Sequence, residues 1–321
     1  REPAASDSAV VDEISRPPPI AKIMTFTCKS AAELGAFDAA AFVAAVGPVY
    51  ENSPWIAERA HAKSAPFDSL TAIDEALWAV VCAAAPEEQL SLLCAHPDLA
   101  GKAAVAGDLT AESTEEQQRA GLSQLTREEM TEFAALNKRY KEKFGFPFIL
   151  AVRNANKRTI LGSFRRRVEN DPGVEKADCL AQVRKIAWMR LRLIAPPAPT
   201  GKLTCHVLDT AHGCPAAGLP ITLRYLGGSG GSMADSVVIG HFETNDDGRL
   251  NGPALSGDAF KEGIYEWTFA VGEYFAVKGS PTAGTAFLDE VPLRFGIDNP
   301  EKHYHVPLLC SPWSYSTYRG S

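Results

Sequence analysis

The sequence predicts two domains of different fold class, an all-α helical bundle followed by an all-β sandwich. Apolar residues recur at helical spacing in the first half, whereas short runs rich in Val, Leu, Thr and aromatic residues alternate with turns in the second half. The two halves meet at 195–201, where three prolines exclude a helix and predict a stiff linker. We therefore expect domains over residues 30–194 and 202–321, after a Pro- and Ser-rich segment, 1–29, expected to be disordered.

The helical half contains clear helix boundaries. The apolar spacing from Leu70 to Ala84 predicts one helix over 68–85, and Pro86 suits the first turn of the next. That second helix should stop at His96, because Pro97 disfavours helical backbone in the residue before it.

Later helices are predicted from capping patterns and spacing. Ser113 with Glu116, and Thr126 with Glu129, match the capping box that opens a helix. A final helix is expected over 178–194, and 146–152 is the one candidate for a short strand in this half.

The second half predicts about seven strands, the number typical of a sandwich of this length. The runs are 202–208, 219–226, 237–243, 265–271, 291–297 and 304–309. The Gly-Ser tract at 227–232 is expected to be a hairpin loop and not a phosphate site, because no helix follows it.

Composition excludes several classes of protein. The net charge of -7 argues against a general nucleic-acid or membrane-surface binder, and no apolar run approaches the length of a membrane span. Seven cysteines without a C-x-x-C pair fit scattered thiols in a reducing compartment. The basic residues of 157–167 are interpreted as a solvated helix face, with a phosphate site as the alternative. We expect a cytoplasmic or peroxisomal protein. The sequence does not decide between the two, and neither a secretory nor a C-terminal peroxisomal signal is visible.

Histidines and arginines concentrate at the two ends of the β half. His303 and His305 must share one strand face, and they lie near a tail, 318–321, that contains tyrosine, arginine and serine. His206 lies in the opening strand and Arg249 follows an Asp-Gly turn. Three interpretations are open: a general acid/base site for a planar polar ring, a three-histidine zinc site, or polar groups satisfied within a core.

The helical half has one comparable cluster. His96 stands at a predicted helix end, where the helix dipole is expected to raise its pKa. Ser113 and Glu116 are either a simple helix cap or part of a catalytic site, and spacing alone does not decide between the two.

The β half resembles the transthyretin-related 5-hydroxyisourate hydrolases through LTCHVLDTAHGCPAAGLPITL, the Asp-Gly-Arg249 turn and HYHVPLLCSPWSYSTYRGS. One departure is Cys205, where threonine is common. The resemblance implies a tetramer with its sites at subunit interfaces. It also implies catalytic roles for His206, Arg249, His305 and Ser321, with Tyr318, Arg319 and Gly320 binding substrate.

The helical half resembles the OHCU decarboxylases through ENSPW, HPDLAG, STEEQ, GFPFI and KIAWMRL; OHCU is 2-oxo-4-hydroxy-4-carboxy-5-ureidoimidazoline, the product of the hydrolase. The resemblance implies that His96 is the central catalytic residue and that Glu116 assists it. It further implies substrate contacts from the side chains and backbone of Pro97, Ser113, Phe148, Ile149 and Arg190. Arg153 and Arg167 are weaker candidates for the arginine role.

Both signatures on one chain resemble the fused allantoin synthases. The resemblance implies that 5-hydroxyisourate is converted to OHCU and then to (S)-allantoin and CO₂, without cofactor or metal, in a homo-oligomer with further dimer contacts through the helical domain. The conjugated ring of OHCU can absorb the electrons released with CO₂, which explains why no cofactor is expected. The alternatives are a transthyretin-like tetrameric binding or scaffold protein, or a chain with only one active domain.

Overall fold

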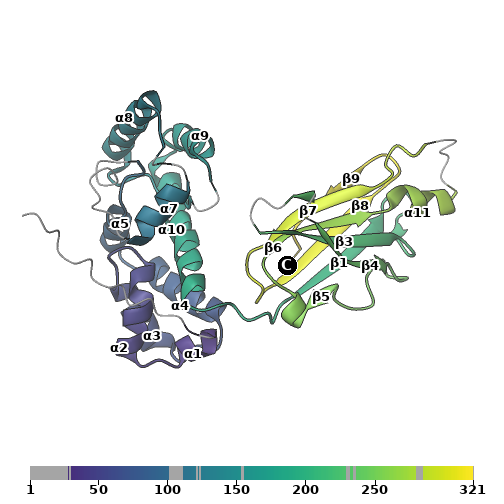
Figure 1. Ribbon diagram of the computed structural model, residues 1–321, viewed down its shortest axis with the longest axis horizontal. Coiled ribbons are helices and arrows are strands. Elements are labelled where there is room, and N and C mark those ends of the chain that lie inside the picture. The colour runs from purple at the N-terminus through teal and green to yellow at the C-terminus, as the bar shows by residue number, and fades with distance from the viewer. Residues whose placement is uncertain are drawn as a thin grey trace, which may run out of the picture.

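The computed structural model describes residues 28, 30–100, 111–120, 122, 124–152, 155–228, 232–233, 236–279 and 285–320. Helices α1 to α10 occupy one part of the molecule and all the described strands the other, together with the short helix α11 (Val271–Val277), and the chain passes between the two parts once, after α10 (Figure 1). The predicted order of a helical domain followed by a β domain is therefore confirmed.

The helical domain surrounds one apolar core that includes Phe42, Phe133, Phe164 and Leu191. Most of its helices begin at a polar side chain that caps a backbone N–H, as Ser69 does for Ala72 (3.1 Å). The helices are α1 (Ala31–Gly35), α2 (Ala39–Val46), α3 (Trp55–Ser64), α4 (Leu70–Ala83), α5 (Pro86–Cys94), α7 (Ala111–Arg119), α8 (Arg127–Phe144), α9 (Lys157–Arg167) and α10 (Pro172–Ile194), with a 3₁₀ turn, η1 (Gly47–Val49).

Several helix boundaries match the sequence predictions. Pro86 is the first residue of α5, and the Thr126–Glu129 capping box opens α8. The helix α10 starts before the predicted residue 178, because Asp171 caps Gly173 and Pro172 fits the first turn. The predicted short strand over 146–152 is wrong: this segment has no strand pairing.

The β domain consists of two sheets. One has the order β2-β1-β8-β9 with β5 also paired to β1, and the other has the order β4-β3-β6-β7. The strands are β1 (Lys202–Asp209), β2 (Cys214–Pro215), β3 (Pro220–Gly227), β4 (Val237–Glu243), β5 (Leu255–Ser256), β6 (Gly263–Phe269), β7 (Val291–Ile297), β8 (His303–Cys310) and β9 (Tyr315–Thr317).

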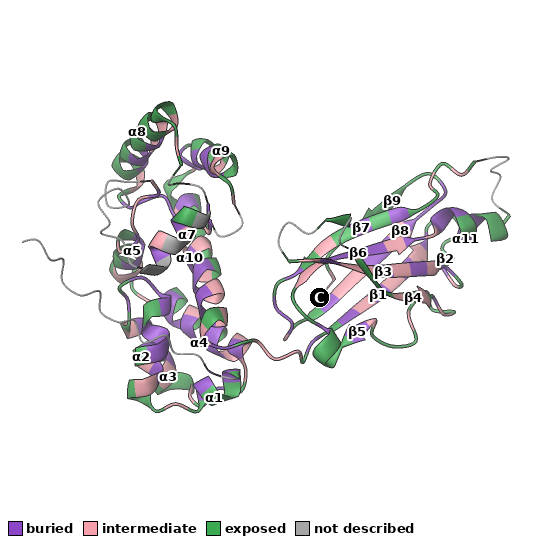
Figure 2. Ribbon diagram, viewed as in Figure 1, coloured by how far each residue is buried: buried purple, intermediate pink, exposed green. Residues whose placement is uncertain are grey.

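The six predicted strands all form, but the all-β prediction was incomplete. The short strands β2, β5 and β9 were not predicted, nor were the 3₁₀ turn η3 (Gly257–Ala259) and the helix α11 (Val271–Val277). The two sheets enclose a core that includes Trp267, Tyr265 and Phe260, and β1 buries alternate residues against it (Figure 2). In β1 this places Cys205 inward and leaves Thr204 and His206 on the other face, as predicted.

The loop between β7 and β8 joins the two domains. The Glu301 carboxylate accepts hydrogen bonds from the N–H groups of Leu70 and Thr71 at the start of α4 (3.1 and 2.7 Å). Asn299 donates to the Thr71 hydroxyl (2.9 Å), and Glu301 also accepts from Ala198 of the linker (3.0 Å). These contacts connect the helical domain directly to the loop that leads into His303.

Two further sequence predictions concern the chain as a whole. Segment 1–29 lies outside the described residues except for Cys28, which is buried and donates its N–H to the Ile194 carbonyl (2.7 Å). Among the described residues no single helix is long and apolar enough to cross a membrane; α4 and α5 together pass that test by length and composition, with a bend of 117°.

Candidate active sites

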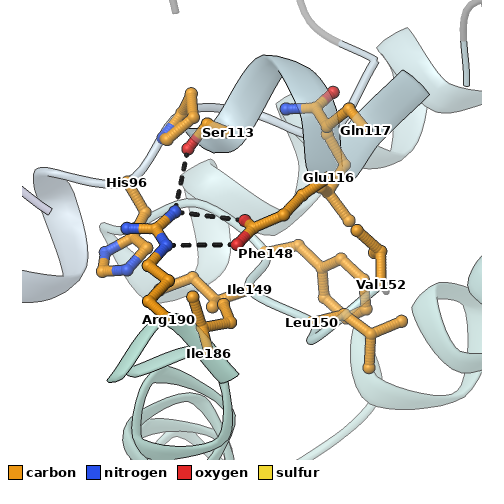
Figure 3. Close-up of a pocket in the computed structure, with 12 residues that line it drawn as sticks. His96, Ser113, Glu116, Gln117, Phe148, Ile149, Leu150, Val152, Ile186 and Arg190 are labelled. Atoms are coloured by element: carbon orange, nitrogen blue, oxygen red, sulfur yellow. Dashed lines mark hydrogen bonds and ion pairs between the residues drawn. The ribbon is translucent and has the colours of Figure 1, made fainter. Parts of the chain in front are cut away.

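The helical domain contains a small pocket with a cavity volume of about 30 Å³. Four separate parts of the chain build it: the turn after α5, helix α7, the irregular segment between α8 and α9, and helix α10 (Figure 3). The site residues predicted for this domain all line the pocket, namely His96, Pro97, Ser113, Glu116, Phe148, Ile149 and Arg190.

Arg190 is the centre of the polar network in this pocket (Figure 3). Its guanidinium donates to both oxygens of Glu116 (3.1 Å each), to Glu51 (2.9 Å), to the Ser113 hydroxyl (3.3 Å) and to the Val49 carbonyl (3.5 Å). These contacts use all five guanidinium N–H groups. In this structure Arg190 therefore holds two carboxylates and a hydroxyl in place.

His96 is buried beside this network, and the sign predicted for its pKa shift is wrong. Burial lowers the pKa of His96 and outweighs the carbonyl of Leu92 and the charge of Glu51, which raise it. Because a carbonyl can only accept, Nδ1 of His96 carries the hydrogen that bonds Leu92 (2.9 Å). The neutral ring then has a free electron pair on Nε2, and Leu92, not Glu116, fixes this tautomer.

The capping box predicted for Ser113 and Glu116 does not form. Ser113 is the third residue of α7, and its hydroxyl donates to Glu51 (3.2 Å) instead of capping the helix. Glu116 is occupied by Arg190. Both side chains thus belong to the pocket.

Glu51 does not line the pocket, but it belongs to the polar network around Arg190, and sequence reasoning did not predict that role. Its carboxylate is 3% exposed and contacts both Arg190 and Ser113. It belongs to the ENSPW motif, but a glutamate in a loop gives no sequence signal of burial. Of the alternative arginines, Arg167 lies outside the pocket lining and Arg153 lies outside the described residues.

The second pocket lies on the outer face of the β1–β8 pair. His303 and His305 project from β8 on one face, and the Thr204 hydroxyl of β1 bonds both rings (2.7 and 2.9 Å). The same depression is lined by Arg249 and Lys202. Thr204 and Lys202 were not predicted as site residues.

Two imidazoles, His305 in the pocket lining and His206 beside the lining, favour the neutral form. Burial, followed by the nearby Arg249 cation, lowers the pKa of both His206 and His305. The His206 and His305 ring centroids are 6.5 Å apart, and Arg249 is fixed next to His206 by a backbone bridge. The structure thus brings together His206, Arg249 and His305, which come from three distant parts of the sequence.

Glycines allow two of these close approaches. A Cβ on Gly248 would lie 2.3 Å from the Val207 carbonyl, and Gly248 has a φ of +69°, so the turn before Arg249 requires glycine. Gly320 donates its N–H to the His305 carbonyl (3.0 Å), and a Cβ there would lie 2.5 Å from the His305 ring. A side chain at position 320 would therefore collide with the His305 ring.

The rest of the C-terminal tail lies less close to the pocket. The Tyr318 side chain is 60% exposed, and the Arg319 guanidinium lies 4.8 Å from the centre of the Tyr304 ring. Ser321 lies outside the described residues. Within the described part of the chain no group of three His, Cys, Asp or Glu side chains is arranged to hold a metal ion, so the three-histidine zinc geometry does not form there.

Comparisons with known proteins match each domain separately. A family model described as OHCU decarboxylase matches residues 35–192, and one described as HIUase/Transthyretin family matches residues 203–320. The 5-hydroxyisourate hydrolase of Pseudomonas aeruginosa is 48% identical over 39% of this chain and 95% of its own length. The 2-oxo-4-hydroxy-4-carboxy-5-ureidoimidazoline decarboxylase of Haloferax volcanii is 40% identical over 50% of this chain and 92% of its own length.

A solved structure matches both domains at once. The crystal structure of an (S)-allantoin synthase is 44% identical, with a TM-score of 0.76 over 92% of this chain and all of the matched chain. The predicted combination of a hydrolase domain with a decarboxylase domain is confirmed. The chain therefore belongs to the OHCU decarboxylase family through its helical domain and to the HIUase/transthyretin family through its β domain, and the two together make it a member of the allantoin synthase family.

Proposed function

We propose that this chain catalyses two consecutive steps of urate breakdown. The β domain hydrolyses 5-hydroxyisourate to OHCU, and the helical domain decarboxylates OHCU to (S)-allantoin. The observation that carries the proposal is the buried His96 pocket, in which a neutral imidazole faces a fixed set of polar groups. The separate histidine pocket on β1 and β8 supports the first step.

The geometry of His96 suits a proton transfer from the hydroxyl oxygen of OHCU to the neighbouring ring carbon. OHCU carries a hydroxyl and a carboxylate on the same carbon. As CO₂ leaves, its bonding electrons enter the conjugated ring, and Nε2 of His96 accepts the hydroxyl proton. The imidazolium returns this proton to the neighbouring ring carbon from one face, and a ring nitrogen takes one proton from solvent. Delivery from one face would yield a single enantiomer.

Substrate binding requires a rearrangement around Arg190. Its donors are all occupied, so a substrate carboxylate must replace one protein acceptor. Glu116 is the partner we expect to move, because its side chain is 20% exposed whereas that of Glu51 is 2% exposed. Ser113, Pro97, Phe148 and Ile149 are proposed to hold the ring, on the support of their place in the pocket lining.

In the β domain we propose that His206 and His305 activate water and that Arg249 polarises the ring carbonyl. Their depressed pKa values support the neutral, proton-accepting form. The Thr204 hydroxyl has one hydrogen, so it donates to one of the two β8 rings and accepts from the other. Tyr318, Arg319, Gly320 and Ser321 are proposed to complete the site.

The assembly and domain limits are also proposals. We propose a helical bundle over 30–194, a linker over 195–201 and a β sandwich over 202–321, supported by the separate apolar cores. We further propose a tetramer through the β domain, with dimer contacts through the helical domain, in the cytoplasm or the peroxisome. Exposed apolar side chains support the β-domain contacts: Val237, Val238, Ile239, Trp313 and Tyr315. Light scattering of the purified chain tests the oligomer.

A spectrophotometric assay tests the two activities separately. Urate and urate oxidase generate 5-hydroxyisourate, and the decay of its absorbance and then that of OHCU is followed. His96→Asn should stall only the second decay, and His305→Asn should slow only the first. His61→Asn and His241→Asn are matched controls, because these histidines bond Phe37 and Thr222 and line neither pocket.

The scaffold alternative makes a different prediction. If the wild-type chain left the OHCU decay at its spontaneous rate, only the hydrolase domain would be active. Wild-type decay in both active-site variants would instead refute the site assignments.

A further inference from the structure

A buried polar cluster lies directly behind the His96 pocket. Arg167 of α9 is 5% exposed and forms an ion pair with Glu175 of α10, which is 0% exposed (2.6 Å). Tyr140 of α8 donates to Glu175, and Asn170 donates to it as well (2.7 Å). The cluster therefore ties three helices together without lining the pocket itself.

The same cluster holds the backbone of the pocket wall. Arg167 donates to the Ile149 carbonyl (2.9 Å) and to the sulfur of Cys179 (3.2 Å). The guanidinium lies 4.7 Å from the centre of the Phe148 ring, which also stacks on Phe164 at 4.0 Å and 11°. The Ile149 carbonyl and the Phe148 ring are thus both held from behind by Arg167.

This wall has no secondary structure of its own to fix it. Residues 146–152 are in neither a helix nor a strand, yet Phe148 and Ile149 are buried and line the pocket together with Arg190. Buried backbone groups need partners, and here side chains supply them. A buried ion pair is seldom more stabilising than apolar packing of the same volume. Stability alone therefore does not explain the Arg167–Glu175 pair, and its position against the pocket wall points to a role in the site.

We propose that Arg167, oriented by Glu175, is a positioning residue for decarboxylation. It fixes Phe148 and Ile149 where they hold the substrate ring with one face toward His96. This inference rests on the proposed decarboxylase function. It also gives Arg167 a different role from the substrate contact considered from the sequence.

Two variants separate positioning from stability. Arg167→Lys keeps a cation that can pair with Glu175. A lysine ammonium cannot make that pair and at the same time bond the Ile149 carbonyl and stack on the Phe148 ring, as the planar guanidinium does. The double variant Arg167→Met with Glu175→Gln removes the anchor without leaving a lone buried charge. Each should raise the KM for OHCU about tenfold, which is less than the roughly hundredfold cost of a full 1 Å misplacement.

The product and the second domain provide further readouts. A loosened wall should lower the enantiomeric purity of the allantoin, measured by circular dichroism with enough enzyme to outpace spontaneous decay. Hydrolysis of 5-hydroxyisourate should be unchanged. Arg165→Met is the matched control, because it removes an exposed ion pair with Glu132 from the same helix (2.6 Å).

The outcomes distinguish the inference from the function on which it rests. If folded Arg167→Lys and the double variant kept the wild-type KM and product purity, Arg167 would be only structural and the inference would be overturned. If the wild-type chain had no effect on OHCU, the proposed function itself would fail.

Discussion

Replacing Gly320 by alanine is predicted to disable hydrolysis in the β domain without unfolding it. An added Cβ would lie 2.5 Å from Cδ2 and 3.0 Å from Cβ of His305. Ordinary contacts begin near 3.4 Å, so the His305 ring or the tail must move by roughly 1 Å. A displacement of that size in a catalytic group costs about a hundredfold in rate. This corresponds to about 2.7 kcal/mol of transition-state stabilisation.

The assay is the decay of 5-hydroxyisourate absorbance, measured at several substrate concentrations to obtain kcat/KM. Gly296→Ala is the matched control, because its Cβ would meet only Ile264 at an ordinary 3.6 Å. Decarboxylation of OHCU by the same Gly320→Ala protein reports on the integrity of the helical domain. A Gly320→Ala enzyme within threefold of wild type would refute the steric reasoning.

Three further predictions concern the helical domain. Because burial lowers the pKa of His96, its neutral form stabilises the fold above about pH 6.5 and this contribution is lost as pH falls through the folded pKa. Decarboxylation should decline over the same acidic range. If the stability of His96→Asn depended on pH in the same way as that of the wild type, or if wild-type activity did not change with pH, this prediction would be contradicted. Arg190→Met should destabilise the domain by about 3–5 kcal/mol in thermal unfolding, because it leaves the Glu51 carboxylate buried and uncompensated; a loss under 1 kcal/mol would argue against this pairing. Glu301→Ala should cost about 1 kcal/mol and speed amide exchange at Leu70 about fivefold, since it removes a carboxylate from the start of α4; unchanged exchange would show that the contact does not form in solution.

Local sequence determined the elements and their order. Pro86 and the Thr126–Glu129 capping box specify helix starts through contacts within a few residues, so the sequence is sufficient to predict them. The period-two burial of β1 likewise follows from local geometry and was predicted. Short pairings such as β5 were not, because a two-residue strand forms only when its partner is already in place.

The site residues were predicted mostly through resemblance, and the structure explains why the residues alone were ambiguous. Ser113 and Glu116 match a helix cap locally, and only the long-range contacts to Glu51 and Arg190 place them in a pocket. The pKa of His96 was predicted with the wrong sign for a related reason. The helix dipole is a local effect, whereas burial by four separate segments is not.

The sequence by itself determined that a helical domain precedes a β domain, and which histidines and arginines are available for chemistry. Only the tertiary structure decided their surroundings. Glu51 forms an ion pair with Arg190, Arg167 lies behind the wall formed by Phe148 and Ile149, and burial of His96 favours its neutral imidazole. The physical reason is that helix caps and strand alternation depend on neighbours in sequence. Burial, charge pairing and steric contact depend on which distant segments the fold brings together.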